Sequence, residues 1–251
     1  YVGPQAQFVR PVSRGGHYNR GEGVRMALSV GAAPCGDFGS FHAQPVDPRS
    51  TDVEPVVLNY SYGILVNDAG QRFTDEAPGM VDATYEEVAR LIMAQRHGIA
   101  YAVFDAGLDD VANWPVTVRS RVPPIEAESL TEMASAMGID GRNFLATVEA
   151  YNQACTRSDE FNPLQTDGLS TTGLEPRKSH WARPISQPPF RAWPMICSNC
   201  FTFGGVKIDE RARVINSEGD AIPGLYAAGE VVGIYYRAYT GATSVMRGAV
   251  T

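Results

Sequence analysis

The chain has 251 residues, of which 44% are hydrophobic and 20% are charged, and its formal net charge is -7. This length accommodates one large domain or two modest ones, and the hydrophobic content excludes a disordered chain. An acidic balance argues against nucleic-acid binding, because that function needs a basic surface to neutralise phosphates. Four cysteines are too few for a disulfide framework, which favours a reducing, cytoplasmic compartment. No apolar run approaches the roughly 20 residues of a membrane helix.

The predicted elements alternate between helices and strands along the chain. Apolar residues at helical spacing predict helices, and short apolar runs bounded by glycine predict strands. Helices are expected at residues 24–32, 84–96, 129–137 and 140–154. Strands are expected at residues 63–67, 71–73, 100–105, 203–208, 213–215 and 222–228. This mixture predicts an α/β protein.

Two local signals refine these elements. The turn at residues 68–70 predicts a β-hairpin between strands 63–67 and 71–73. Thr84 is the predicted N-cap of the helix that follows it, because Glu87 stands three residues later, as in a capping box.

Three segments show no periodicity and predict irregular structure: residues 1–19, 41–50 and 156–193. Loops of such length in a compact protein tend to be functional or linking. The basic run 177–180, with Arg183 nearby, predicts a solvated loop, or alternatively a patch that steers an anion.

The strongest chemical signal is the apolar strand that ends in Gly229-Glu230, followed by a predicted helix start at Gly241. A carboxylate just beyond a strand end can hold a sugar-like hydroxyl. The free N–H groups from Gly241 to Val245 suit an anionic ring or a phosphate. Together they indicate the second half of a flavin site, although a plain strand–loop–helix in an α/β core has the same spacing.

Three ordered motifs carry a resemblance to a known family. They are residues 18–28 (YNRGEGVRMAL), 63–76 (GILVNDAGQRFTDE), and 202–209 (TFGGVKID) with 222–230 (IPGLYAAGE). They resemble the fumarate reductase/succinate dehydrogenase flavoprotein superfamily, and in detail its branch of tricarballylate dehydrogenases. The resemblance covers nearly the whole chain and implies FAD as the cofactor.

The resemblance also implies a domain organisation. Residues 1–36 and 200–251 would form part of a Rossmann-like FAD-binding domain, and residues 37–199 an inserted α+β cap that contributes to the substrate site. The family's Gly-rich fingerprint for the FAD pyrophosphate, G-x-G-x-x-G, does not occur in this sequence. Because the chain also starts with Tyr1, we expect it to be part of a longer enzyme.

The cofactor residues implied by the resemblance gather in the last quarter of the sequence, and Glu230 is the expected partner of the ribityl chain. They are Gly204, Glu230, Gly241, Ser244 and Val245.

The implied substrate residues depart in part from the family pattern. His42 falls at the place of a substrate-carboxylate-binding histidine, and Thr202 belongs to the Thr-x-Gly-Gly motif. A second family histidine is replaced here by Cys200-Phe201. The family arginine after the Gly-Glu motif corresponds to Tyr239.

Arg237, two positions before Tyr239, could bind a substrate carboxylate with both arms of its guanidinium. The alternative is an ion pair with Glu230 or with a loop carboxylate.

The family's proton-donating arginine is missing, and Tyr85 takes its place when the helix is aligned by its end. Tyr85 and Tyr239 are therefore candidate bases toward an activated C–H, since a nearby cation or helix dipole lowers a phenol pKa. Flavin N5 would accept the hydride, and the related 3-ketosteroid dehydrogenases are similar in relying on tyrosines for this step. In a chain with 11 tyrosines the alternative role is packing.

The remaining reactive residues have structural interpretations. Arg72 is expected to pair with Glu76. Cys197 and Cys200 form a lone C-x-x-C without the further ligands of a zinc site, so no metal is expected. Two buried thiols are favoured over a redox pair near the flavin.

The sequence thus predicts an FAD-dependent dehydrogenase that forms a C=C bond in a small di- or tricarboxylate. One alternative is a 3-ketosteroid dehydrogenase-like enzyme, in which a carbonyl group activates the C–H. Another is a non-catalytic fragment or binding module that lacks the pyrophosphate site. A small carboxylate is the expected partner, with no nucleic acid and no membrane span, and the electron acceptor is open.

Overall fold

The computed structural model describes residues 3–11, 18–156 and 161–239. The chain divides into two compact units. Unit 1 contains residues 1–6, 14–43 and 199–251, and unit 2 contains residues 7–13 and 44–198. The assignment of unit 1 to the flavin domain and of unit 2 to the cap stays a prediction.

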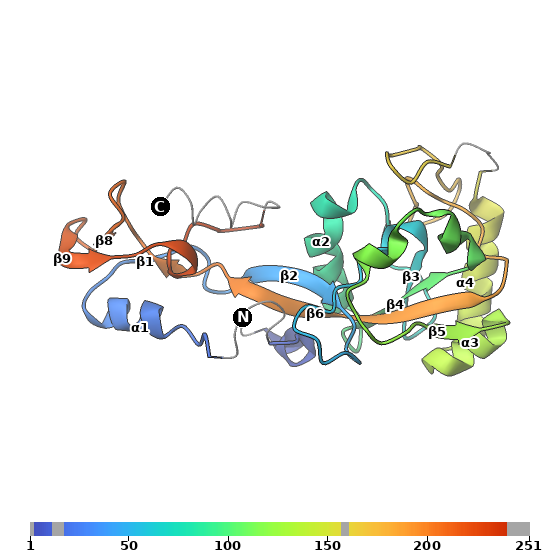
Figure 1. Ribbon diagram of the computed structural model, residues 1–251, viewed down its shortest axis with the longest axis horizontal. Coiled ribbons are helices and arrows are strands. Elements are labelled where there is room, and N and C mark those ends of the chain that lie inside the picture. The colour runs from blue at the N-terminus through green and yellow to red at the C-terminus, as the bar shows by residue number, and fades with distance from the viewer. Residues whose placement is uncertain (1–2, 12–17, 157–160, 240–251) are drawn as a thin grey trace. The chain divides into compact units, whose positions relative to one another are not determined.

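A five-stranded sheet organises the central part of the chain (Figure 1). Its strand order is β2-β6-β4-β3, and β5 also pairs with β6. The strands are β2 (Phe41–Val46), β3 (Ile64–Asn67), β4 (Ile99–Phe104), β5 (Ile125–Ala127) and β6 (Phe190–Thr202). The pairs β3–β4, β4–β6 and β5–β6 are antiparallel.

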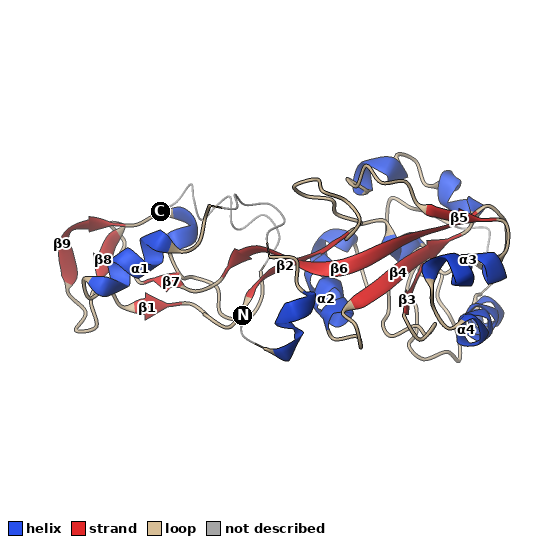
Figure 2. Ribbon diagram, turned by 90° about the horizontal axis from the view of Figure 1, so that it is seen from below, coloured by secondary structure: helices blue, strands red, loops and turns tan. Residues whose placement is uncertain are grey.

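In unit 2, helices cover both faces of this sheet. Successive side chains of a strand point to opposite faces, so β3 contributes side chains to a core on each face. Ile64 and Val66 of β3 pack in the core under α3 (Leu130–Met137) and α4 (Gly141–Ala154). Leu65, between them, packs in a second core with Val88 of α2 (Val81–Met93). Figure 2 shows these helices against the sheet. The predicted α/β class is confirmed.

The helices of unit 2 begin where local capping directs them, with one exception. Ser129 accepts a hydrogen bond from the N–H of Glu132 at the start of α3, and Asp140 caps α4 through the N–H of Asn143. The predicted cap at Thr84 is wrong, because α2 starts three residues earlier and the Thr84 hydroxyl donates to a carbonyl inside the helix.

Three segments depart from the predicted strands and loops. Residues 41–46 were expected to be irregular but form β2, with all six residues buried. Residues 190–193, at the end of the predicted loop 156–193, begin β6. The predicted turn forms, with the N–H of Asn67 donating to the Gln71 carbonyl, but the segment 71–73 contributes a single bridge, Val66 to Arg72, rather than a strand.

Unit 1 contains a short helix and two small sheets. The helix α1 (Glu22–Ser29) packs Ala27 against Val206 and Val214. Strand β1 (Pro34–Cys35) pairs with β7 (Gly205–Val206), and β8 (Arg213–Ile215) pairs with β9 (Ala221–Tyr226). Residues 203–208 therefore form a shorter strand than the sequence predicts.

Short 3-10 helices complete the described chain: Pro4–Phe8, Tyr60–Tyr62, Ala106–Asp110, Trp114–Thr117 and Gly229–Val231. The first of them replaces part of the loop predicted at residues 1–19. Within the described residues, the search for a helix both long and apolar enough to cross a membrane finds none.

Candidate functional site

The fold of unit 1 brings two predicted site residues, His42 and Tyr239, into direct contact. His42 lies in β2 with its side chain fully buried. Its ring centroid is 4.0 Å from that of Tyr239 and 5.0 Å from that of Phe201. The contact with Phe201 was not predicted, because it depends on how β6 ends.

Five rings form what we call the aromatic cluster: His42, Phe201, Phe203, Tyr235 and Tyr239. Phe203 lies 5.3 Å from Tyr235, and Phe201 meets the edge of Tyr239 at 5.2 Å and 87°. These separations are typical of favourable aromatic pairs. Phe203 and Tyr235 are buried, whereas Phe201 and Tyr239 remain partly exposed. The cluster therefore has a closed interior and an open side.

Close backbone crossings hold the segments of this cluster together. A Cβ atom added at Gly36 or Gly233 would collide with the backbone of a neighbouring segment, so only glycine fits there. The N–H of Asp37 donates to the Tyr235 carbonyl at 2.9 Å, and the N–H of Phe203 donates to the carbonyl of residue 40 at 3.1 Å. These bonds fix the segments that carry the rings.

The other predicted substrate and cofactor residues near this cluster differ in exposure. Thr202 and Arg237 are exposed, so both can meet a solute. Gly204 is buried beneath Phe38, and a Cβ at Gly204 would lie 2.5 Å from Cγ of that ring. Glycine is therefore required for this ring contact, and a cofactor role of Gly204 stays a prediction.

Glu230 lies in the 3-10 turn that follows β9 and is exposed. Gly229 precedes it with φ +72, a conformation that favours glycine, and Asn19 donates to the Glu230 carboxylate at 3.2 Å. An exposed carboxylate is a hydrogen-bond acceptor, which fits the hydroxyl-rich chain of FAD. The residues present thus fit the cofactor that the sequence implies.

Three predicted cofactor residues, Gly241, Ser244 and Val245, lie outside the described residues.

Tyr85, the other predicted base, belongs to unit 2. It lies in α2 and packs, half-buried, against the core that contains Leu65 and Trp193. The neighbouring Thr84 hydroxyl is 3.3 Å from the Tyr60 hydroxyl, and burial raises the Tyr60 pKa. Tyr85 therefore has a packing role, and its catalytic role stays a prediction.

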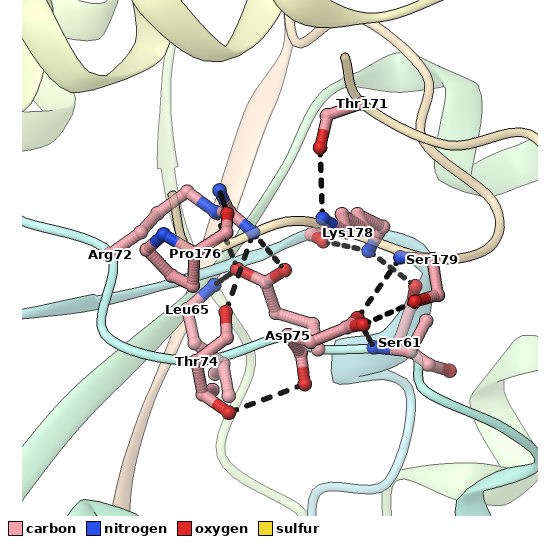
Figure 3. Close-up of polar contacts among 12 residues, drawn as sticks. Ser61, Leu65, Arg72, Thr74, Asp75, Thr171, Pro176, Lys178 and Ser179 are labelled. Carbon is pink, nitrogen blue, oxygen red and sulfur yellow. Dashed lines mark hydrogen bonds and ion pairs between the residues drawn. The ribbon is translucent and has the colours of Figure 1, made fainter. Parts of the chain in front are cut away.

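Unit 2 also contains a group of charged and hydroxyl side chains that we call the polar cluster: Arg72, Asp75, Glu76, Lys178 and Ser179 (Figure 3). Arg72, Glu76 and Lys178 are buried, and Asp75 and Ser179 are partly exposed. The predicted pair of Arg72 and Glu76 is confirmed. It is bidentate, with Nε to Oε1 at 2.8 Å and a terminal nitrogen to Oε2 at 2.7 Å. Glu76 also accepts from the N–H of Leu65 at 3.0 Å.

Lys178 corrects the prediction that residues 177–180 form a solvated loop. Its side chain is fully buried, and Nζ donates to the carbonyls of Ser61 at 2.6 Å and Gly63 at 2.5 Å. Burial lowers the pKa of Lys178 from 10.5 to about 8. Ser179 next to it donates to Asp75 through its hydroxyl. These contacts tie the loop to β3, so the cluster has the geometry of a structural anchor.

The prediction of two buried thiols is confirmed, because Cys197 and Cys200 are buried and neither forms a disulfide. Burial raises the pKa of Cys197 to about 12, which keeps this thiol protonated and unreactive near neutral pH. Among the described residues, no group of three or more His, Cys, Asp or Glu side chains could hold a metal ion.

Unit 1 of this mixed α/β fold presents the exposed Gly229-Glu230 turn directly after β9, where the sequence predicts part of a flavin site. Comparison with protein families identifies the domain, because the model of the FAD binding domain family matches residues 5–245. The chain therefore belongs to the FAD binding domain family, and its resemblance to the fumarate reductase/succinate dehydrogenase flavoprotein superfamily is confirmed.

Known proteins similar to the chain include a fumarate reductase (cytochrome) from Shewanella frigidimarina, 32% identical over 215 residues that cover 85% of this chain and 34% of that protein. A 4-oxocyclohexanecarboxylate 2-dehydrogenase from Sinomonas cyclohexanicum is 29% identical and covers 91% of this chain and 43% of its own length.

Among solved structures, 3-ketosteroid delta1-dehydrogenase from Sterolibacterium denitrificans shares the fold with a TM-score of 0.67 and 19% identity. The match covers 98% of this chain and 48% of that one. The chain thus spans less than half the length of each of these proteins.

Proposed function

We propose that the chain is part of an FAD-dependent oxidoreductase that forms a C=C bond by removing a hydride and a proton from adjacent carbons of a small carboxylate. The observation that carries this proposal is the contact of His42 with Tyr239, in the same unit as the exposed Glu230. Membership of the FAD binding domain family and similarity to proteins named as a fumarate reductase and a 2-dehydrogenase support it.

In this proposal unit 1 contributes part of the cofactor site and unit 2 is the cap. The Glu230 carboxylate accepts hydrogen bonds from the hydroxyls of the ribityl chain, which are charge-assisted and therefore strong. FAD, when bound, supplies the acceptor for the hydride.

Tyr239 receives the proton. One C–H bond of the substrate loses its hydrogen together with both electrons, as hydride. The neighbouring C–H loses a proton to the Tyr239 oxygen, which releases its own hydroxyl proton to solvent, and the electron pair left on that carbon forms the C=C bond. The buried His42 ring packs against Tyr239 and holds it in place. Tyr85 of unit 2 is the second candidate for the base.

Exposed polar residues of unit 1 bind the carboxylates. Arg237 offers the planar, bidentate geometry that suits a carboxylate, and Thr202 offers a hydroxyl donor. The finer proposal is a di- or tricarboxylate similar to tricarballylate. The burial of His42 favours positioning of Tyr239 over direct carboxylate binding.

A second candidate is a dehydrogenase of the ketosteroid type, in which a ketone rather than a carboxylate acidifies the C–H. The observation that favours it is the packing of two aromatic rings, Phe201 and Tyr239, against His42. Under this alternative the Tyr239 hydroxyl acts next to a carbonyl group, and Arg237 is not needed for binding.

The test is a substrate screen on the purified full-length protein. We expect it to carry FAD, seen as flavin absorbance, and to lose that absorbance anaerobically when mixed with the right di- or tricarboxylate. Bleaching by ketosteroids alone would favour the second candidate. A colourless protein that added FAD does not restore would contradict both and support a non-catalytic role.

A further inference from the structure

Phe201 occupies a central place on the open side of the aromatic cluster. Its ring lies 5.0 Å from His42, 5.2 Å from Tyr239 and 5.8 Å from Tyr235. It touches both residues of the proposed catalytic pair, yet its own side chain stays partly exposed. A ligand that approaches Tyr239 from the open side would therefore be close to Phe201.

The chemistry of this position excludes a good contact with an anion. A phenylalanine ring offers no hydrogen-bond donor, and its π face carries partial negative charge. A carboxylate placed against it would lose hydration without gaining a hydrogen bond, which is costly. Tyr239 beside it presents a second ring, so the two together form an apolar surface.

The segment that carries Phe201 is fixed rather than adaptable. Phe201 is the second-last residue of β6. The N–H of Phe203, two residues later, donates to the carbonyl of residue 40. The buried rings of Phe203 and Tyr235 support it from behind, at 6.1 and 5.8 Å. A preformed aromatic surface of this kind selects flat apolar groups by contact area and ring geometry.

We propose that Phe201 is a specificity-determining residue and that, with Tyr239, it receives a cyclic, apolar part of the substrate. Among the small carboxylates of the proposed function, this surface selects a ring-bearing carboxylate over an open-chain di- or tricarboxylate. This inference rests on the proposed function, because it takes the contact of His42 with Tyr239 as part of the active site.

The experiment measures equilibrium binding to the full-length, FAD-loaded protein, by calorimetry and by perturbation of the flavin absorption spectrum. Three probes separate the contribution of an aromatic ring to binding from that of a second carboxylate. Acetate and benzoate each carry one carboxylate and differ by the ring, and succinate carries two carboxylates. We expect benzoate to bind the wild-type protein at least about tenfold more tightly than acetate, because only benzoate stacks on the two rings.

Substitution then tests the residue itself. Phe201→Ala should abolish most of the preference for benzoate and leave acetate binding within about twofold, since the carboxylate contacts remain. Phe201→Leu keeps apolar volume but removes the π face, and should retain part of the preference even if the alanine variant fails to fold. Tyr226→Ala removes another exposed ring of unit 1, on β9, and should change nothing.

Phe201→His adds donors, and should shift binding from benzoate toward succinate. Equal binding of acetate and benzoate by the wild-type protein, or a benzoate preference that survives in both Phe201→Ala and Phe201→Leu, would overturn the inference. A protein that holds FAD and is bleached by an open-chain dicarboxylate, with no ring preference, refutes this inference alone. A protein that holds no FAD refutes the proposed function as well.

Discussion

The polar cluster of unit 2 consists of charged and hydroxyl side chains that are hydrogen-bonded to one another or to the backbone, whereas the aromatic cluster of unit 1 consists of rings gathered around one histidine. Arg72 and Glu76 pair in two hydrogen bonds, and Lys178 donates to two carbonyls. In the aromatic cluster, by contrast, Phe201 and Tyr239 keep an exposed side. A closed network stabilises a loop, and an open cluster can receive a ligand. The partners of the side chains therefore separate the anchor from the candidate site: the charges of the polar cluster are hydrogen-bonded to one another or to the backbone, whereas Phe201 and Tyr239 present partly exposed rings.

The largest expected effect comes from opening the polar cluster. Glu76→Ala leaves Arg72 buried without its carboxylate and should lower the free energy of unfolding by about 3 to 5 kcal/mol. The three tryptophans, Trp114, Trp181 and Trp193, all belong to unit 2, so tryptophan fluorescence during urea unfolding reports on this unit.

The matched control is Glu86→Ala, which removes a more exposed i,i+4 pair with Arg90 on α2. Because water screens the attraction within such pairs, Glu86→Ala should lower the free energy of unfolding by less than about 1 kcal/mol. An equal decrease in the free energy of unfolding in Glu76→Ala and Glu86→Ala would contradict the anchoring role of the polar cluster.

The pH dependence of unfolding tests Lys178. Between pH 8 and 10.5 an unfolded lysine still holds its proton, while the buried amine has released it. Unfolding then takes up a proton, so this group makes the free energy of unfolding rise with pH, by at most about 1.4 kcal/mol per unit. Lys178→Met should lack this rise.

Other groups titrate in the same range in both proteins, and the difference between the wild-type and Lys178→Met curves isolates Lys178. Parallel curves would show that its pKa is not lowered.

The smallest expected effect concerns the cofactor. Glu230→Ala should weaken FAD binding by the full-length protein about tenfold, because a charge-assisted hydrogen bond is lost. Glu218→Ala removes another exposed carboxylate of unit 1 and should leave FAD binding unchanged. An unaltered FAD content in Glu230→Ala would remove Glu230 from the site.

Features encoded by neighbouring residues could be predicted from the sequence. The helices that begin after Ser129 and Asp140 are examples, because their caps lie within three residues. The strand β2 could not be predicted, since Pro45 argues against a strand. It is tolerated because β2 stands at the end of the strand order, where one side of the strand needs no donor. Partners distant in sequence override local signals.

The same limit applies to the functional residues. His42 and Tyr239 were found through the resemblance to a family. Their mutual contact could not be predicted from either segment, because the two residues are 197 positions apart in the sequence (239 − 42). The burial of Lys178 could not be predicted, because its acceptors, the carbonyls of Ser61 and Gly63, lie more than 100 residues away in the sequence. The ring of Phe201 gave no signal of its own, since an isolated aromatic residue is typical of any core.

The most direct test of the proposed active site is the rate of anaerobic flavin reduction by a bleaching substrate in the full-length protein. We predict that Tyr239→Phe slows this rate about 100-fold or more while FAD remains bound, because the phenol is the proton acceptor. Tyr85→Phe, in unit 2, is measured beside it and reports on the second candidate. Wild-type rates in both variants would contradict the account, because neither phenol would then be the base.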